Sequence, residues 1–245
     1  MDIRGYASTH VGRRENNEDA YLADFETGLF LVADGMGGYE GGEIASHLVV
    51  DSFQQFFDRG GPADIEAFTG TAVDGKTPAE GMMELAVRRA SRAVEQRRQG
   101  RLAAMGSTVV AMMMRGDWAV LAHVGDSRIY RLRNRRLECM TRDHSLYAQL
   151  LDAGVVSARA VANRNLITRA IGVPGSSKPD VATHRVHPGD VYLLCSDGLT
   201  DVVPDSDIES IITELPLSRA VDALVAEAYV AGSADNITAL LVQAR

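Results

Sequence analysis

The sequence predicts an α+β layered fold, because segments with strand periodicity and segments with helix periodicity follow one another in blocks. The order is strands, two helices, strands, helices and a final strand, whereas a parallel sheet would need regular alternation of strand and helix. The chain has 245 residues, of which 46% are hydrophobic and 24% charged. This is enough for one sizeable core, so residues 1–245 are expected to form a single domain.

The first half of the chain supplies the first strands and both early helices. Residues 2–12 alternate in polarity, and residues 20–34 are typical of a hairpin. Apolar residues recur at helical spacing over 41–60 and 79–100, on either side of a connector at 60–78 that carries Gly, Pro and Asp. These two segments are expected to form a helical pair.

The second half is expected to return to strands and then to add further helices. Successive strands are predicted within residues 106–141, and an apolar strand is expected to end at Asp197. The other expected elements are a short helix at 145–153, a polar loop at 154–166, helices near 205–214 and 217–231, and a last strand at 236–245.

Charge and composition exclude several classes of protein. The net charge of -8 and the isoelectric point of about 5.3 argue against a surface for nucleic acid or anionic lipid. The sequence has no apolar leader and no run near the roughly 18 apolar residues that span a bilayer, so we expect a cytoplasmic protein. Cys139 and Cys195 lack metal-ligand spacing, so no disulfide or zinc site is expected.

Apolar strand segments repeatedly end on a carboxylate. "LFLVADG" ends at Asp34, "VYLLCSDG" at Asp197 and "AVLAHVGDS" at Asp126, while Asp235 directly precedes the last strand. A single Asp-Gly is usually an ordinary turn, but neighbouring strands would bring these acids onto one rim, where buried carboxylates need a cation. Oxygen ligands of this kind favour Mg²⁺ or Mn²⁺.

The segment "VGRRENNEDA" adds an arginine beside paired acids. On an extended chain, Arg14 and Glu18 would point to the same side, and Asp19 would point to the other side unless the strand bulges. The planar guanidinium of Arg14 is suited to phosphate. Taken alone, however, such a segment is more often a charged surface than a site.

Eight motifs together resemble a known family. They are "RENNEDA", "LVADGMGG", "GSTVV", "HVGDSRIY", "TRDHS", "LITRAIG", "LLCSDGLTD" and "SADNIT". Their order and spacing, over about residues 4–243, are similar to those of the metal-dependent protein phosphatases, the type 2C Ser/Thr phosphatases, in their short bacterial form. The resemblance implies a sandwich of two antiparallel sheets flanked by helical pairs, with a two-metal centre at one end. It also implies hydrolysis of phosphoserine and phosphothreonine, opposing a bacterial Ser/Thr kinase.

The resemblance also implies metal ligands. Asp34 would bridge two Mn²⁺ or Mg²⁺ ions that share the attacking water, with the carbonyl of Gly35 on the second ion and with Asp197 and Asp235 on the first. Asp126, together with Asp197, would hold a third, weaker ion. The alternative for Asp126 is a turn cap or an ion pair with the nearby arginine of "GDSR".

Further roles follow from the same resemblance. Glu18 and Asp19 would hold waters of the metal ions, and Arg14 would grip the substrate phosphate. Where eukaryotic relatives carry a histidine, this chain has Met36, so no general acid is assigned and a metal-bound water is the more economical candidate. A flap subdomain is expected around 145–168, and the protein is expected to be a monomer.

Other chemistries fit the sequence less well. Neither cysteine is followed by a phosphate loop that closes with arginine. The acids at 205–207 are typical of a helix N-cap, and the glycines at 35–42 lack the Gly-Lys-Ser/Thr of a nucleotide loop. The alternative from another class is an inactive phosphoprotein-binding domain on the same fold, although a pure binder has no need to keep these acids together.

Overall fold

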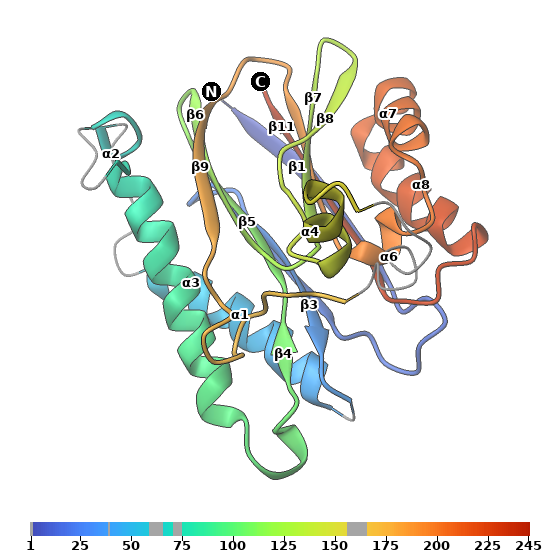
Figure 1. Ribbon diagram of the computed structural model, residues 1–245. Helices are drawn as coiled ribbons and strands as arrows, with labels where there is room; N and C mark the ends of the chain where they lie inside the picture. The colour runs from blue at the N-terminus through green and yellow to red at the C-terminus, as the bar shows by residue number, and fades with distance from the viewer. Residues whose placement is uncertain (1, 39, 59–65, 71–74, 156–165) are drawn as a thin grey trace.

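The computed structural model describes residues 2–38, 40–58, 66–70, 75–155 and 166–245. Two antiparallel β-sheets pack face to face, and helices cover the outer face of each sheet, which gives four layers (Figure 1). This confirms the α+β sandwich. The apolar side chains form one core between the sheets and one core under each helical layer.

The first sheet, sheet A, has the strand order β1-β11-β10-β7-β8. Its strands are β1 (Ile3–His10), β7 (Arg128–Arg133), β8 (Arg136–Cys139), β10 (Val191–Cys195) and β11 (Ile237–Ala244). The second sheet, sheet B, has the order β2-β3-β5-β6-β9, with β4 paired to β3. Its strands are β2 (Asp19–Asp24), β3 (Leu29–Met36), β4 (Gly106–Ser107), β5 (Val109–Arg115), β6 (Trp118–Val124) and β9 (Asp180–Arg185).

Strand β3 contributes side chains to two of the three cores. Leu29 and Leu31 pack under the helices of sheet B, whereas Phe30 and Val32 pack between the two sheets. Successive side chains of a strand point to opposite faces, so a strand that is covered on both sides is apolar throughout. This continuous apolar stretch ends at Asp34.

Two helical pairs form the outer layers. Sheet B is covered by α1 (Gly41–Asp58) and α3 (Pro78–Arg97), and sheet A by α7 (Asp205–Glu214) and α8 (Leu217–Val230). The short elements are α2 (Glu66–Thr69), a 3-10 helix η1 (Gly100–Leu102), α4 (Leu146–Asp152) and α6 (Asp197–Thr200).

The start of α3 is well specified. The Thr77 hydroxyl accepts a hydrogen bond from the backbone N–H of Glu80, and the Glu80 side chain accepts one from the backbone N–H of Thr77.

Most predicted elements are confirmed, with two differences. The connector at 60–78 contains the short helix α2, which the sequence did not indicate. The acids at 205–207 are not an N-cap: Pro204 takes that position, and Asp205 instead accepts a hydrogen bond from the Tyr130 hydroxyl at 2.9 Å. Of the expected flap at 145–168, residues 156–165 lie outside the described residues.

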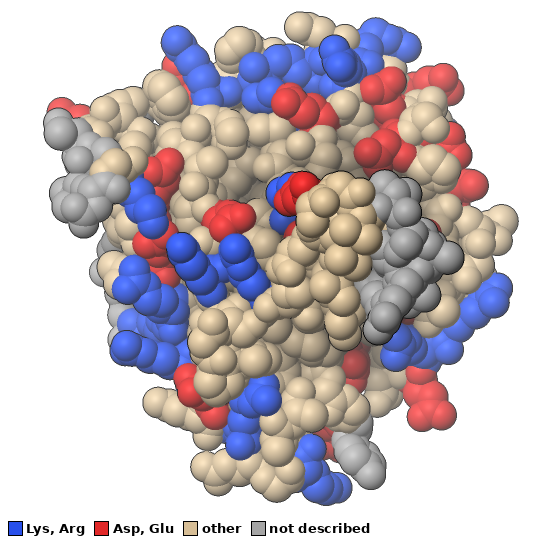
Figure 2. Space-filling view, viewed as in Figure 1, with Lys and Arg blue, Asp and Glu red and all other residues tan. Residues whose placement is uncertain are grey.

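The charged surface carries both signs. Figure 2 shows Lys and Arg over α3 and at the end of the molecule near the β7–β8 hairpin, whereas Asp and Glu gather over α7. In this view the Lys and Arg residues do not form one continuous basic face. Among the described residues, no helix combines the length and apolar character that crossing a membrane requires.

Candidate metal centre and active site

The sandwich brings the predicted acids to one end of the molecule. In sheet B, Asp19 begins β2 and lies opposite Asp34 near the end of β3, and Asp126 follows β6. In sheet A, Asp197 follows β10 and Asp235 precedes β11. Because antiparallel neighbours start and end at the same edge, acids at these positions share one rim.

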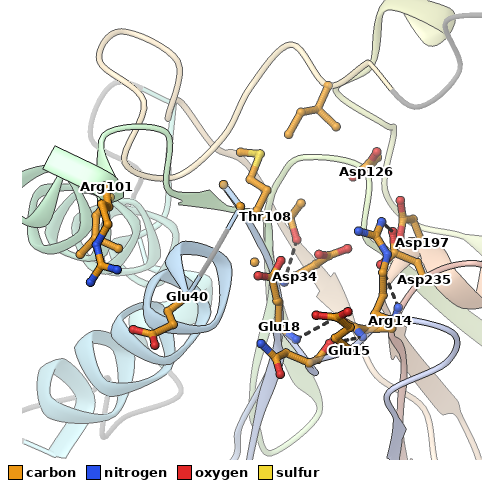
Figure 3. A pocket seen from close by; sticks show the side chains of 18 residues that line it. Arg14, Glu15, Glu18, Asp34, Glu40, Arg101, Thr108, Asp126, Asp197 and Asp235 are labelled. Carbon is orange, nitrogen blue, oxygen red and sulfur yellow. Dashed lines mark hydrogen bonds and ion pairs between the residues drawn. The ribbon is translucent and has the colours of Figure 1, made fainter. Parts of the chain in front are cut away.

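A pocket of about 750 Å³ opens at this rim. Its lining includes Arg14, Glu18, Asp34, Asp126, Asp197 and Asp235. Figure 3 shows Asp126, Asp197, Asp235 and Arg14 on one side of Asp34, with Arg101 and Glu40 on the opposite side. The structure therefore brings together every acid that the strand ends predicted.

The backbone around Asp34 is held from both sides. Its N–H donates to the Thr108 hydroxyl at 3.1 Å, and its carbonyl accepts from the Thr108 N–H and the Ser107 hydroxyl. Gly35 packs so closely against α1 that an added Cβ would lie 2.0 Å from the Gly42 carbonyl oxygen. The Asp34 carboxylate is thus fixed on a rigid strand end, and the next residue has to be glycine.

Asp19 is buried among hydroxyl groups. One carboxylate oxygen, Oδ2, accepts from the Ser196 hydroxyl at 2.8 Å and from the Thr238 hydroxyl at 2.7 Å, while Oδ1 is buried without a hydrogen-bond partner. As a register partner, Asp19 lies on the same face of the sheet as Asp34. Arg14 and Glu18 line the pocket and Asp19 is not among its lining residues, and the chain before Asp19 bends, so that β2 begins only there.

Asp197 and Asp126 complete the buried part of the rim. Asp197 is the first residue of α6, and its Oδ1 is buried without a hydrogen-bond partner. Asp126 is 9% exposed. The nearby arginine, Arg128, forms a two-point ion pair with Asp143 at 2.7 and 2.9 Å. The structure thus gives Arg128 a partner other than Asp126.

The crowding of these acids raises their pKa values. Burial, and then the neighbouring carboxylates, raise the pKa of Asp34 and of Asp197 well above 3.8. Burial raises the pKa of Asp19 to about 6 and, with the help of Asp143, that of Asp126 to about 7. In each case the charged form is disfavoured because it is desolvated and faces like charges.

A hard divalent cation fits this arrangement. The donors are carboxylate oxygens, and two of them, Asp19 Oδ1 and Asp197 Oδ1, are buried without hydrogen-bond partners. Buried polar atoms of this kind are uncommon unless an ion or water completes them. Oxygen-only donor sets select Mg²⁺, Mn²⁺ or Ca²⁺ over softer metals.

Arg14 lies at the mouth of the pocket beside Asp235. Its Nη2 donates to Asp235 Oδ2 at 2.7 Å, and its side chain is 55% exposed. The loop that carries Arg14 is held by Asn236, whose amide donates to the carbonyls of Val11 at 2.8 Å and Asn16 at 2.9 Å. Arg14 is therefore placed next to the acids while part of its guanidinium faces solvent.

Several residues that support the site were not identified from the sequence. Asn236, Thr108 and Ser196 fix the Arg14 loop, the Asp34 backbone and the Asp19 carboxylate, respectively. Asn236 and Thr108 stand in the quoted motifs "SADNIT" and "GSTVV", and Ser196 stands in "LLCSDGLTD". Their motif membership was the available signal, but their roles depend on contacts between strands that are distant in sequence.

Among the described residues, no histidine lines the pocket, whereas Met36 does. His123 and His144 are buried and stack on each other with ring centroids 4.4 Å apart. This placement agrees with leaving the general acid unassigned.

A four-layer sandwich that gathers carboxylate oxygens and an arginine at one end fits a metal-dependent hydrolase of phosphoric monoesters. Residues 6–228 match the family described as Protein phosphatase 2C, and the chain belongs to that family.

Known relatives align with nearly the whole chain. Serine/threonine phosphatase stp of Listeria monocytogenes is 35% identical over 247 residues, covering 96% of this chain and 93% of the relative. A structure described as PppA, a key regulatory component of T6SS in Pseudomonas aeruginosa, matches with a TM-score of 0.85 and 36% identity over 100% of this chain and 99% of that one.

A third relative contains metal ions. The catalytic domain of the serine threonine protein phosphatase PstP, in complex with 2 manganese ions, matches with a TM-score of 0.84 and 30% identity over 98% of this chain and 97% of that one. Together with the family match, these relatives establish that the protein is a metal-dependent serine/threonine protein phosphatase.

Proposed function

We propose that Asp34, Asp197, Asp235 and the carbonyl of Gly35 hold two divalent cations, Mn²⁺ or Mg²⁺, and that this centre removes phosphate from serine and threonine residues of proteins. The observation that carries the proposal is the cluster of buried carboxylates with raised pKa values at one end of the sandwich. Such a cluster is costly without a cation and favourable with one.

Different residues of the chain would have different roles at this centre. When bound, two divalent cations lower the pKa of a water that they share and neutralise the phosphoryl oxygens. Asp34, between the neighbouring acids, would contact both ions. Glu18 and Asp19 would accept hydrogen bonds from waters that complete the coordination, and the backbone of Glu18 is fixed by Asn236 at 2.8 Å.

Arg14 would orient the substrate. Nη2 donates to Asp235 Oδ2 and Nε donates to the Ala234 carbonyl at 3.2 Å, which leaves Nη1 and the second hydrogen of Nη2 for two-point contact with a phosphate at the pocket mouth. Asp126, with Asp197, would hold a third and weaker cation. A water molecule held at Asp126 would then donate the proton to the leaving alkoxide, since Met36 cannot do so.

The partners follow from this chemistry. The substrates would be phosphorylated proteins, and a Ser/Thr kinase would supply them. We further propose that the enzyme acts in the cytoplasm as a monomer.

Hydrolysis of p-nitrophenyl phosphate tests whether this centre carries the activity. We expect turnover with Mn²⁺, its loss after EDTA and its return when Mn²⁺ is restored. Asp34→Asn serves as the inactive control and Asp51→Asn, an exposed residue of α1, as the matched control. Turnover that survives exhaustive chelation, or that Asp34→Asn leaves unchanged, would contradict the proposed two-ion centre.

A further inference from the structure

A second cluster of titratable groups lies beside the pocket but outside it. His123 on β6 and His144, just before α4, stack with an interplanar angle of 17°, and each is 6% exposed. Asp180 of β9 lies 3.1 Å from His144 Nε2, and Arg169 Nη1 lies 2.8 Å from Asp180 Oδ1. Two histidines and a carboxylate at this spacing have the composition of a metal site.

The hydrogen bonds argue against a metal here. His144 Nδ1 accepts the N–H of Gly125 at 3.2 Å, and Nε2 lies 3.1 Å from Asp180 Oδ2 and 3.0 Å from Arg169 Nη1. His123 Nε2 faces the Arg142 carbonyl at 2.8 Å and therefore carries a proton. These ring nitrogens are thus already engaged, and the Arg169 guanidinium lies against both His144 Nε2 and Asp180, whereas a metal needs free lone pairs and no competing cation.

The His144 ring has a neighbour of functional interest, the turn at Gly125. The N–H of Gly125 donates to His144 Nδ1, and the carbonyl of Gly125 accepts the His144 N–H at 2.8 Å. Both backbone polar groups of Gly125 are therefore engaged by one residue 19 positions away. Burial lowers the pKa of His144 to about 4, so the acceptor nitrogen remains unprotonated at neutral pH.

The turn itself is sterically constrained. Gly125 has a φ of +107°, and an added Cβ would lie 2.6 Å from the Thr108 methyl group. The next residue is Asp126, and the Thr108 side chain also contacts the Asp34 backbone. The orientation of Asp126 on the rim thus depends on how this glycine is held.

His144 also holds the stem of the loop that follows α4. Its carbonyl accepts the Thr168 N–H at 2.7 Å, and a bridge joins Ser145 to Ile167. Ile167 lines the pocket. One residue therefore connects the turn of Asp126, through three backbone or ring contacts, to the described stem of the expected flap.

We propose that His144 is a positioning residue: its ring and backbone fix the Gly125 turn so that Asp126 stays on the pocket rim, in register with the stem that carries Ile167. The functional part rests on the proposed role of Asp126. The structural part, the hold on Gly125, stands independently of catalysis.

Two substitutions test the contributions of the two ring nitrogens of His144 separately. In His144→Asn the amide oxygen can occupy the place of Nδ1 and still accept from Gly125, whereas in His144→Gln the amide reaches the place of Nε2 and Asp180 instead. We expect His144→Asn to keep the Gly125 amide protected from hydrogen exchange in the metal-free protein, as measured by NMR. We expect His144→Gln to speed this exchange by about tenfold or more, because a buried hydrogen bond is lost.

Kinetics provide the second measurement. His144→Gln should lower kcat on a phosphopeptide by roughly tenfold and on p-nitrophenyl phosphate much less, with KM little changed, as for loss of Asp126 itself. His144→Asn should stay within about threefold of the wild type. His187→Gln, an exposed histidine distant from the pocket lining, is the matched control.

The outcomes distinguish positioning from packing. Equal exchange rates at Gly125 in both variants, or equal kinetic losses on both substrates accompanied by equal falls in Tm, would overturn the proposal. If the wild type showed no phosphatase activity, the proposed function would fail, while the exchange of the Gly125 amide would still decide whether His144 holds the turn.

Discussion

Replacing Asp126 with asparagine should stabilise the metal-free protein at pH 8 and do so much less at pH 5. Asp126 is buried, and its desolvation together with nearby Asp143 raises its pKa to about 7 from an ordinary value of 3.8. The folded protein therefore binds a proton at Asp126 more tightly than the unfolded chain does. Stability falls as pH rises from 3.8 to about 7, and above pH 7 the loss is complete.

The size of the effect follows from the two pKa values. At about 1.4 kcal/mol per pH unit, the difference between 3.8 and about 7 corresponds to roughly 4 kcal/mol of destabilisation by Asp126 at pH 8. At pH 5 the same relation gives about 1.5 kcal/mol. These are upper limits, because protonation of neighbouring acids relieves part of the repulsion. Asparagine has the same shape and no charge, so it removes the penalty.

Urea denaturation after exhaustive EDTA treatment measures this directly. We expect the midpoint for Asp126→Asn to exceed that of the wild type at pH 8 and the gap to narrow at pH 5. Asp51→Asn, which replaces an exposed acid on α1, should change the free energy of unfolding by less than about 0.5 kcal/mol at either pH. A variant that is less stable than the wild type at pH 8, or a gap that does not depend on pH, would refute the electrostatic reasoning.

Three further predictions concern activity. Asp34→Asn should abolish turnover more completely than Asp235→Asn, because Asp34 would contact both ions. Isothermal titration with Mn²⁺ should also show the larger loss of metal affinity for Asp34→Asn. Equal losses of metal affinity in the two variants would contradict the bridging role of Asp34. Arg14→Ala should raise KM for phosphopeptides and leave Mn²⁺ affinity nearly unchanged, with Arg14→Lys recovering part of the loss. Arg13→Ala is the control, and equal damage there would mean that the wrong arginine was chosen. Asp126→Ala should lower kcat on phosphopeptides, whose alkoxide leaving group needs a proton, more than on p-nitrophenyl phosphate, whose leaving group does not; equal losses with unchanged metal stoichiometry would exclude the third-ion role.

The acids of the rim could be predicted from the sequence because a simple rule governs them. Strands covered on both faces are apolar throughout, so a carboxylate at the end of such a strand stands out, as at Asp34 and Asp197. Periodicity likewise predicted the helices α1, α3, α7 and α8. These features are local, and the sequence displays them directly.

The supporting contacts could not be predicted in the same way. The side on which Asp19 lies depends on the point at which β2 begins, and the residues before it are too irregular for a spacing argument. The bonds from His144 to Gly125 and from Asn236 to Asn16 join segments that only the finished sandwich brings together. Helix α2, only four residues long, is too short to produce a periodic pattern.

The crowding of carboxylates that would give the rim a high affinity for metal ions also lowers the stability of the metal-free protein. After burial, the carboxylates of Asp197 and Asp126 raise the pKa of Asp34, and that of Asp126 raises the pKa of Asp197, so each divalent ion that binds removes repulsion in addition to forming its own bonds. By linkage, metal that binds the folded chain adds its binding free energy to the stability of the fold. Substitutions that relax the rim should therefore yield a more stable apoprotein with weaker metal affinity. Stability of the empty chain and affinity for the ions are thus opposed at this site.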